Sequence, residues 1–380
     1  MSALFALGFR PLYLLAGAFA ALSIAGWAGL FAGWMPPSYL HGSSRWHAHE
    51  MIFGYTFAVI VGFLFTAGSN WTRQPTPSGG GLAAICAAWL MARIFALSPL
   101  PLVSLAFDVA FALSAAIGLG IAVWRARNTR NYFFVALILA VGALNVAFHL
   151  ALLDLLEIDI SHVLAIALDI VLFICVVMGG RVIPMFTNNG VPGSNARRTP
   201  AVERLSLGSV LALLVLDLVG VPEMAIAIVA AVACLANGAR LALWNPWATR
   251  RKSIVWILHA AYGWIAIHLA LRAASAMAWA SDLLAIHALT VGAVGGLTIG
   301  MMTRTARGHT GRALETSSAE TAAYLLVMAA AVVRVFGSLA ADWTVSAIVA
   351  SGLLWAAAFA LFTICYWPIL SRPRVDGRPG

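Results

Sequence analysis

Long apolar stretches, separated by short polar ones, run along almost the whole chain. Each stretch is close to the 20 or so apolar residues that an α-helix needs to cross the hydrocarbon layer of a membrane. The pattern predicts an all-α fold, a polytopic membrane bundle of about twelve transmembrane helices. The expected helices cover residues 12–34, 50–68, 82–98, 101–124, 132–153, 161–180, 204–220, 222–244, 254–274, 283–302, 321–340 and 343–370.

The longest predicted connection lies between the sixth and seventh helices. It covers residues 181–203 and is rich in proline, glycine and asparagine. We expect it to be a cytoplasmic loop that joins two sets of six helices, 1–180 and 204–370. No convincing repeat relates the two sets. Because the spans use up most of the chain, residues 1–380 are predicted to form a single transmembrane domain.

The distribution of charged residues predicts how the bundle is oriented in the membrane. Only 10% of the residues are charged, against about 25% in a soluble domain. The net charge of +9 would suggest a nucleic-acid partner in a soluble protein, but here the partner is the lipid bilayer. Eighteen basic residues fall on the side of the N-terminus and two, Arg45 and Arg272, on the other. Since cytoplasmic loops carry the excess of lysine and arginine, both termini are predicted to be cytoplasmic.

Six of the nine histidines fall near the outer ends of five predicted helices. Polar side chains at membrane depth are costly and usually functional. Imidazole is the usual ligand of haem iron, copper and zinc, so this shared level predicts a metal site; the alternative for each residue is a hydrogen bond at the membrane interface. The candidate metal ligands are His47, His49, His149, His162, His268 and His287.

Spacing separates some of these candidates. His47 and His49 are two residues apart, which on a helix turns their side chains about 200° from each other, so we expect them to have different partners. Arg272 follows His268 by four residues and shares its helix face. Together with Arg45 it places a guanidinium where haem propionates need charge-assisted partners. The alternative for both arginines is contact with lipid headgroups.

Acidic residues are scarce in the predicted spans. Glu50 follows His49 directly, and we expect this carboxyl group to act catalytically by delivering protons from outside. Asp169 lies seven residues after His162, on nearly the same helix face. It is expected either to orient His162 or to pair with a buried arginine such as Arg93.

Four motifs resemble the NnrS family, membrane proteins associated with the bacterial response to nitric oxide and described as containing haem and copper. The motifs are WHAHEMIFGY at 46–55, GRVIPMFTNNG at 180–190, HALTVGAVGG at 287–296 and GMMTRTARGHTGR at 300–312. The resemblance implies haem b and copper as cofactors, nitric oxide as a partner, and the inner membrane of a bacterium as the location.

A weaker likeness connects the chain to haem-copper oxidases and nitric oxide reductases. Those enzymes hold haem with histidines of helices 2 and 10, and the likeness carries these roles onto His49 and His287. It departs from their pattern at Leu289, where a second histidine is typical, and in lacking the adjacent histidines of helix 7. Any copper would then use imidazoles from other helices, namely His47, His149, His162 and His268.

The resemblance implies a redox protein that binds and detoxifies nitric oxide by reducing it to nitrous oxide. Its electron donor would be a quinol or a cytochrome on the outer side. One alternative is a transporter for a metal ion or small solute, because twelve helices in two sets of six are common among carriers. Another is a haem-based sensor that binds nitric oxide without turnover.

Overall fold

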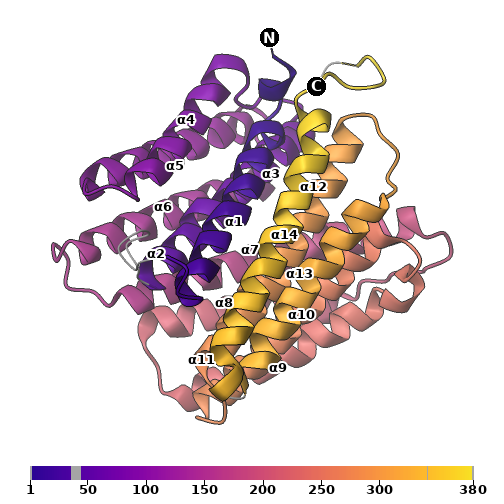
Figure 1. Ribbon diagram of the computed structural model, residues 1–380. Coiled ribbons are helices and arrows are strands. Elements are labelled where there is room, and N and C mark those ends of the chain that lie inside the picture. The colour runs from indigo at the N-terminus through magenta and orange to yellow at the C-terminus, as the bar shows by residue number, and fades with distance from the viewer. Residues whose placement is uncertain (1, 36–43, 340, 379–380) are drawn as a thin grey trace.

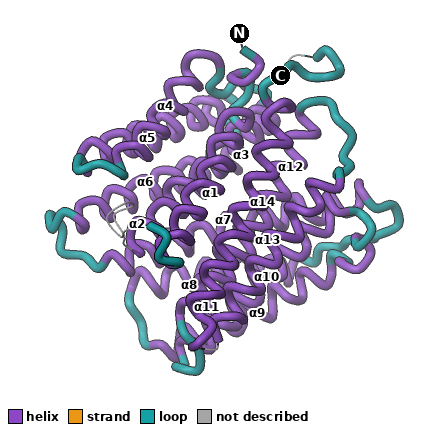
Figure 2. The backbone as a smooth tube through the Cα atoms, viewed as in Figure 1, coloured by secondary structure: helices purple, strands orange, loops and turns teal. Residues whose placement is uncertain are grey.

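The computed structural model describes residues 2–35, 44–339 and 341–378. Within them the chain forms helices joined by loops, with no strand (Figure 2). Short 3-10 turns flank several of the helices. Twelve continuous helical segments make up this described part: α1 Phe9–Phe31, α2 to α3 Ser44–Thr72, α4 Gly79–Phe95, α5 Pro101–Arg125, α6 Tyr132–Leu152, α7 Ile160–Gly190, α8 Pro200–Val219, α9 Glu223–Leu243, α10 Ser253–Ala276, α11 to α12 Asp282–His309, α13 Ser318–Phe336 and α14 Thr344–Leu370.

Ten of the twelve described segments are long and apolar enough to cross a membrane. The two other segments, α4 and α8, do not meet this requirement, one because of its length and the other because of its charged residues. The apolar helix α4 has 17 residues, and α8 carries Glu203, Arg204 and Asp217 within its 20 residues. The predicted all-α polytopic bundle is confirmed.

Several helices are longer than their apolar pattern predicts, among them the tenth segment, which ends at His309 rather than residue 302. α7 does not end at residue 180 but continues to Gly190, with Pro184 inside it, so the loop expected at 181–203 is shortened. Packing explains the extension, because Thr187 is fully buried and its hydroxyl lies 2.7 Å from the Nε2 atom of His259 on α10. The second segment begins at Ser44 rather than residue 50, which places the first two histidine candidates inside the helix.

The first and last helices of the bundle pack against each other. The first helix, α1, packs along the last, α14, and the two chain ends lie near each other at one end of the bundle (Figure 1). Because the connections between helices are short, successive helices run in opposite directions. The second segment, α7 and the tenth segment are the most deeply buried of the long apolar helices.

Two of these buried segments contain a π-helical stretch. In π-helix the hydrogen bonds run from i to i+5, and such stretches occur often at functional sites. One stretch is Glu50–Thr56 and the other is Ala288–Gly295, so each begins directly after a histidine. A hydrogen bond of 2.5 Å between the hydroxyls of Tyr55 and Thr298 joins the two segments.

Candidate metal centre

Six histidines lie toward the end of the bundle that is opposite to the chain termini. Each belongs to the half of its helix nearer that end, since the helices alternate in direction. They are His47, His49, His149, His162, His268 and His287. The structure does not bring all six together: it separates them into one tight group, one looser pair and two single residues.

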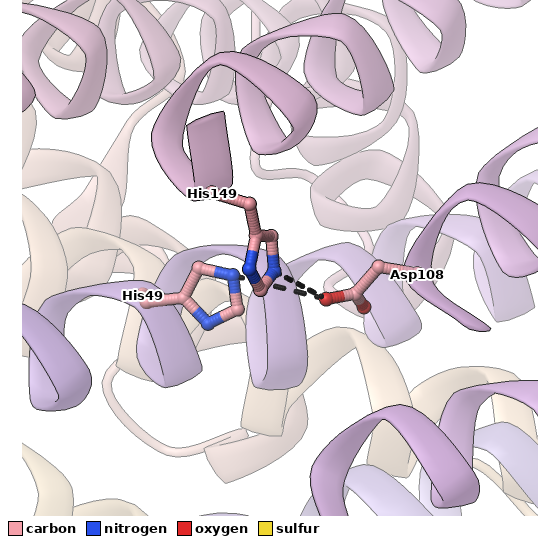
Figure 3. Close-up of side chains that lie close together, drawn as sticks. All are labelled: His49, Asp108 and His149. Atoms are coloured by element: carbon pink, nitrogen blue, oxygen red, sulfur yellow. Dashed lines mark hydrogen bonds and ion pairs between the residues drawn. The ribbon is translucent and has the colours of Figure 1, made fainter. Parts of the chain in front are cut away.

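The tight group consists of His49, Asp108 and His149, which come from α2, α5 and α6 (Figure 3). The Asp108 Oδ2 atom lies 3.2 Å from Nε2 of His149 and 3.8 Å from Nε2 of His49. All three side chains are buried. Both imidazoles therefore turn a nitrogen toward one carboxylate oxygen in the interior of the bundle.

Glu50 and Asn145 fix the orientation of His49. Its Nδ1 atom donates to Oε1 of Glu50 at 2.8 Å, and its Nε2 atom lies 2.8 Å from the Asn145 amide oxygen. A carboxylate that accepts from Nδ1 selects the tautomer whose Nε2 lone pair is free to bind a metal. This lone pair points toward Asp108. Because Nδ1 donates to Glu50, Nε2 is the one ring nitrogen of His49 that is open to a metal.

Arg93, on α4, connects the two carboxylates. Its Nη1 atom donates to both oxygens of Glu50 at 2.9 Å, and its Nη2 atom forms a short ion pair with Asp108. A buried carboxylate is stable as an ion only when it is paired and hydrogen bonded. Arg93 thus pairs with both acids and fixes the position of Asp108 relative to the imidazoles.

The group has the chemistry of a metal site. Metal–nitrogen bonds of about 2.0–2.1 Å separate the ligands of one ion by roughly 3–4 Å, and the three ligand atoms lie within 4.8 Å of one another. Two imidazoles and one carboxylate suit copper, zinc or iron. The Nδ1 atom of His149 is buried and has no hydrogen-bond partner among the described residues, so the polar groups here are incompletely satisfied.

His47 and His287 form the looser pair. The two imidazoles lie near each other and near Arg334 on α13. The His47 ring stacks on Trp27 of α1, with centroids 4.8 Å apart. The Nδ1 atom of His287 donates to the Leu283 carbonyl at 2.7 Å, which leaves its Nε2 atom available. As the two-residue spacing predicts, His47 and His49 have different partners.

The remaining candidates lie apart from these groups. His162 and Arg45 are exposed. His268 donates from Nδ1 to the Ala285 carbonyl at 2.8 Å, and its buried Nε2 atom has no partner within the described part of the chain. Arg272 is paired with Asp169, so this acid has an arginine partner, as the second alternative predicts, but the arginine is Arg272 rather than Arg93.

Sequence reasoning missed Asn145, the pairing of Arg93 with Glu50, and Arg334. The sequence does contain one signal for Asn145. Asn145 precedes His149 by four residues in a helix that is otherwise apolar, and residues four apart share one helix face. The contact of Arg93 with two acids joins three separate helices, and no spacing within one helix encodes it.

The comparison with known protein families gives one match. The pattern described as "NnrS protein" matches residues 3–374, nearly the whole chain. No curated protein matches significantly. The matched range contains both histidine groups and the two π-helical stretches. The chain therefore belongs to the NnrS family.

Proposed function

We propose that this protein binds copper at His49, Asp108 and His149 and uses the site to remove nitric oxide by reducing it to nitrous oxide. The observation that carries the proposal is the convergence of two imidazoles and a carboxylate from three helices on one buried point. Buried ionisable groups inside a membrane bundle mark functional sites by default. The family resemblance supplies copper and nitric oxide as the expected cofactor and partner.

Charge supports copper in its monovalent state. Glu50 and Asp108 contribute two negative charges and Arg93 one positive charge, and neutral imidazoles add none. The buried group therefore has one excess negative charge, which costs free energy in a low dielectric. One Cu(I) ion cancels that excess, whereas a divalent ion leaves an excess positive charge.

We propose His47 and His287 as the ligands of haem b. The likeness to haem-copper oxidases assigns this role to His49 and His287, but Nδ1 of His49 donates to Glu50 and its Nε2 atom faces Asp108 in the proposed copper site. His47 is its neighbour on the same helix, and its Nδ1 atom is buried with no partner among the described residues. Arg334 lies near both imidazoles, where a guanidinium suits haem propionates.

The reduction of two nitric oxide molecules consumes two electrons and two protons and yields nitrous oxide and water. Copper and haem would supply the electron transfer to nitric oxide. His47 and His49, two residues apart on one helical segment, place the two sites beside each other, and the burial of His49, Asp108 and His149 keeps water from the copper site. Glu50 orients His49 and is itself fixed by Arg93, which supports a positioning role for this carboxylate rather than delivery of protons.

The proposed location is the inner membrane of a bacterium, with both termini in the cytoplasm. The termini share one end of the bundle (Figure 1), and eighteen of the basic residues were assigned to that side from the sequence. Both histidine groups then lie near the outer side. There a cytochrome or quinol would serve as the electron donor.

Purified protein in detergent tests the proposal through its optical spectrum and its copper and haem content. We expect a Soret band and stoichiometric copper. His149→Ala should remove copper and keep haem, and His287→Ala should remove haem and keep copper. His162→Ala, at an exposed position, is the matched control. A wild-type protein with neither cofactor would refute the assignment.

Turnover separates the enzyme from the two other functions. With a reductant present, the enzyme produces nitrous oxide from nitric oxide. A protein that binds nitric oxide at haem without producing nitrous oxide is a sensor. Uptake of copper into proteoliposomes without a bound chromophore would instead identify a transporter.

A further inference from the structure

A second group of charged residues joins α7, α8 and α10 and contains none of the proposed copper and haem ligands. Arg272 of α10 donates from Nη1 to Oδ1 of Asp169 on α7 at 2.5 Å, and from Nη2 to Oδ2 of Asp217 on α8 in a short ion pair. Asp169 is 3% exposed, and the two other residues are partly buried. One arginine therefore joins three helices through two acids.

The charges in this group do not balance. Two carboxylates carry two negative charges, and Arg272 carries one positive charge. Among the described residues, His268 lies near it, one turn earlier on α10, and as a neutral imidazole adds no charge. An uncompensated charge inside a membrane bundle is costly. The excess of one negative charge requires one further positive charge.

The geometry indicates where that charge resides. The carboxyl groups of Asp169 and Asp217 lie within hydrogen-bonding range of each other, yet two carboxylates have no donor to share. The Oδ2 atom of Asp169 is buried and has no hydrogen-bond partner among the described residues. A single proton on the pair supplies the missing donor and also cancels the excess charge.

We propose that Asp169 and Asp217 share one proton at neutral pH and form, beside Arg272, a buried proton-holding site of the bundle. Two adjacent carboxyl groups retain a proton in this way because they cannot both ionise at close range. A metal ion fits the group less well. The group offers only carboxylate oxygens, and Arg272 already occupies one oxygen of each acid. The proposal does not depend on the function proposed above.

Infrared difference spectroscopy of the full-length protein in lipid nanodiscs tests this site. We expect the wild-type protein at neutral pH to show a carbonyl stretch of a protonated carboxyl group, and this band should shift when H₂O is replaced by D₂O. Asp169→Asn and Asp217→Asn should each abolish the band, because the single remaining carboxylate pairs with Arg272 and stays ionised.

Two further variants complete the experiment. Glu157→Gln, at an exposed position in the loop before α7, is the matched control and should keep the band. Arg272→Gln should increase the band, since both acids then become protonated. A wild-type spectrum without the band would overturn the proposal even if the variants failed to fold. A band that survives in both aspartate variants would also overturn the proposal. A band that disappears when sodium is added would overturn it as well.

Discussion

The Nη1 atom of Arg93 donates to both carboxylate oxygens of Glu50, at 2.9 Å each. This contact joins α4 to the first residue of a π-helical stretch. The Nη2 atom of the same guanidinium forms an ion pair with Asp108, and Asp108 faces the two imidazoles of the metal centre. One arginine thus couples the irregular backbone after His49 to the proposed ligand set.

Arg93→Met should strongly destabilise the protein. The substitution keeps much of the side-chain volume but leaves Glu50 and Asp108 without their cation, and breaking a buried ion pair from one side costs about 3–5 kcal/mol. Thermal unfolding of the purified protein in detergent measures the effect. Arg45→Met, at an exposed position, should leave the unfolding temperature unchanged.

A triple variant tests the cause of that loss. Replacing Glu50 by Gln and Asp108 by Asn together with Arg93→Met removes all three charges, and most of the lost stability should return because no unpaired charge remains. If the triple variant were as unstable as Arg93→Met alone, packing rather than charge would be the source of the effect.

Glu50→Gln should weaken copper binding while leaving the ligands in place. Glutamine is similar in shape, but its amide lacks the charge that favours the Nδ1–H tautomer of His49. Loss of such an outer partner lowers metal affinity by about 10- to 100-fold. Competition with a Cu(I) chelator measures the affinity. An unchanged affinity would mean that Glu50 does not orient the ligand.

The apolar pattern of the chain was sufficient to predict its helices. The twelve apolar stretches correspond to twelve helical segments in the described part of the chain, and ten of these are long and apolar enough to cross a membrane. The pattern failed where a helix extends beyond its uninterrupted apolar stretch. Residues 181–190 mix apolar with polar residues and contain Pro184, yet they remain helical because Ile183, Pro184 and Thr187 are buried in the bundle.

The candidate site was only partly predictable. Depth in the membrane selected six histidines, among them His49 and His149, because all six lie near the outer ends of predicted helices. Their convergence on Asp108 depends on the packing of α2, α5 and α6, which no local spacing encodes. The π-helical stretches were also invisible in the sequence, because α- and π-helix satisfy the same backbone groups with a difference of one residue.

Tyr55→Phe should affect stability without affecting the metal centre. The variant loses the hydrogen bond between the tyrosine hydroxyl and Thr298, but Thr298 still donates to the Val294 carbonyl at 2.6 Å. The expected loss is therefore about 0.5–1.5 kcal/mol. Copper and haem contents should equal those of the wild type. Loss of either cofactor would show that this contact also positions a ligand.

Gly54→Ala should disturb the metal centre through a single methyl group. A Cβ atom at this position would lie 2.8 Å from Nη1 of Arg93 and 3.2 Å from Oε2 of Glu50, so the ion pair must shift. The carbonyl of Gly54 also accepts a hydrogen bond of 2.9 Å from the buried Trp89 indole, which limits movement of the backbone. Overpacking of this kind costs about 1–3 kcal/mol, and we expect copper content to fall with stability.

Gly80→Ala provides the matched control for this variant. Gly80 lies in α4, the helix that carries Arg93, but a Cβ atom there has no neighbour within 4 Å. Alanine in place of glycine within a helix is favourable by roughly 0.5–1 kcal/mol, so this variant should be as stable as the wild type or slightly more stable. Thermal unfolding and copper content measured side by side give the comparison. If Gly54→Ala matched Gly80→Ala in both, the close approach of Arg93 to the π-helical stretch would have no role in holding the site.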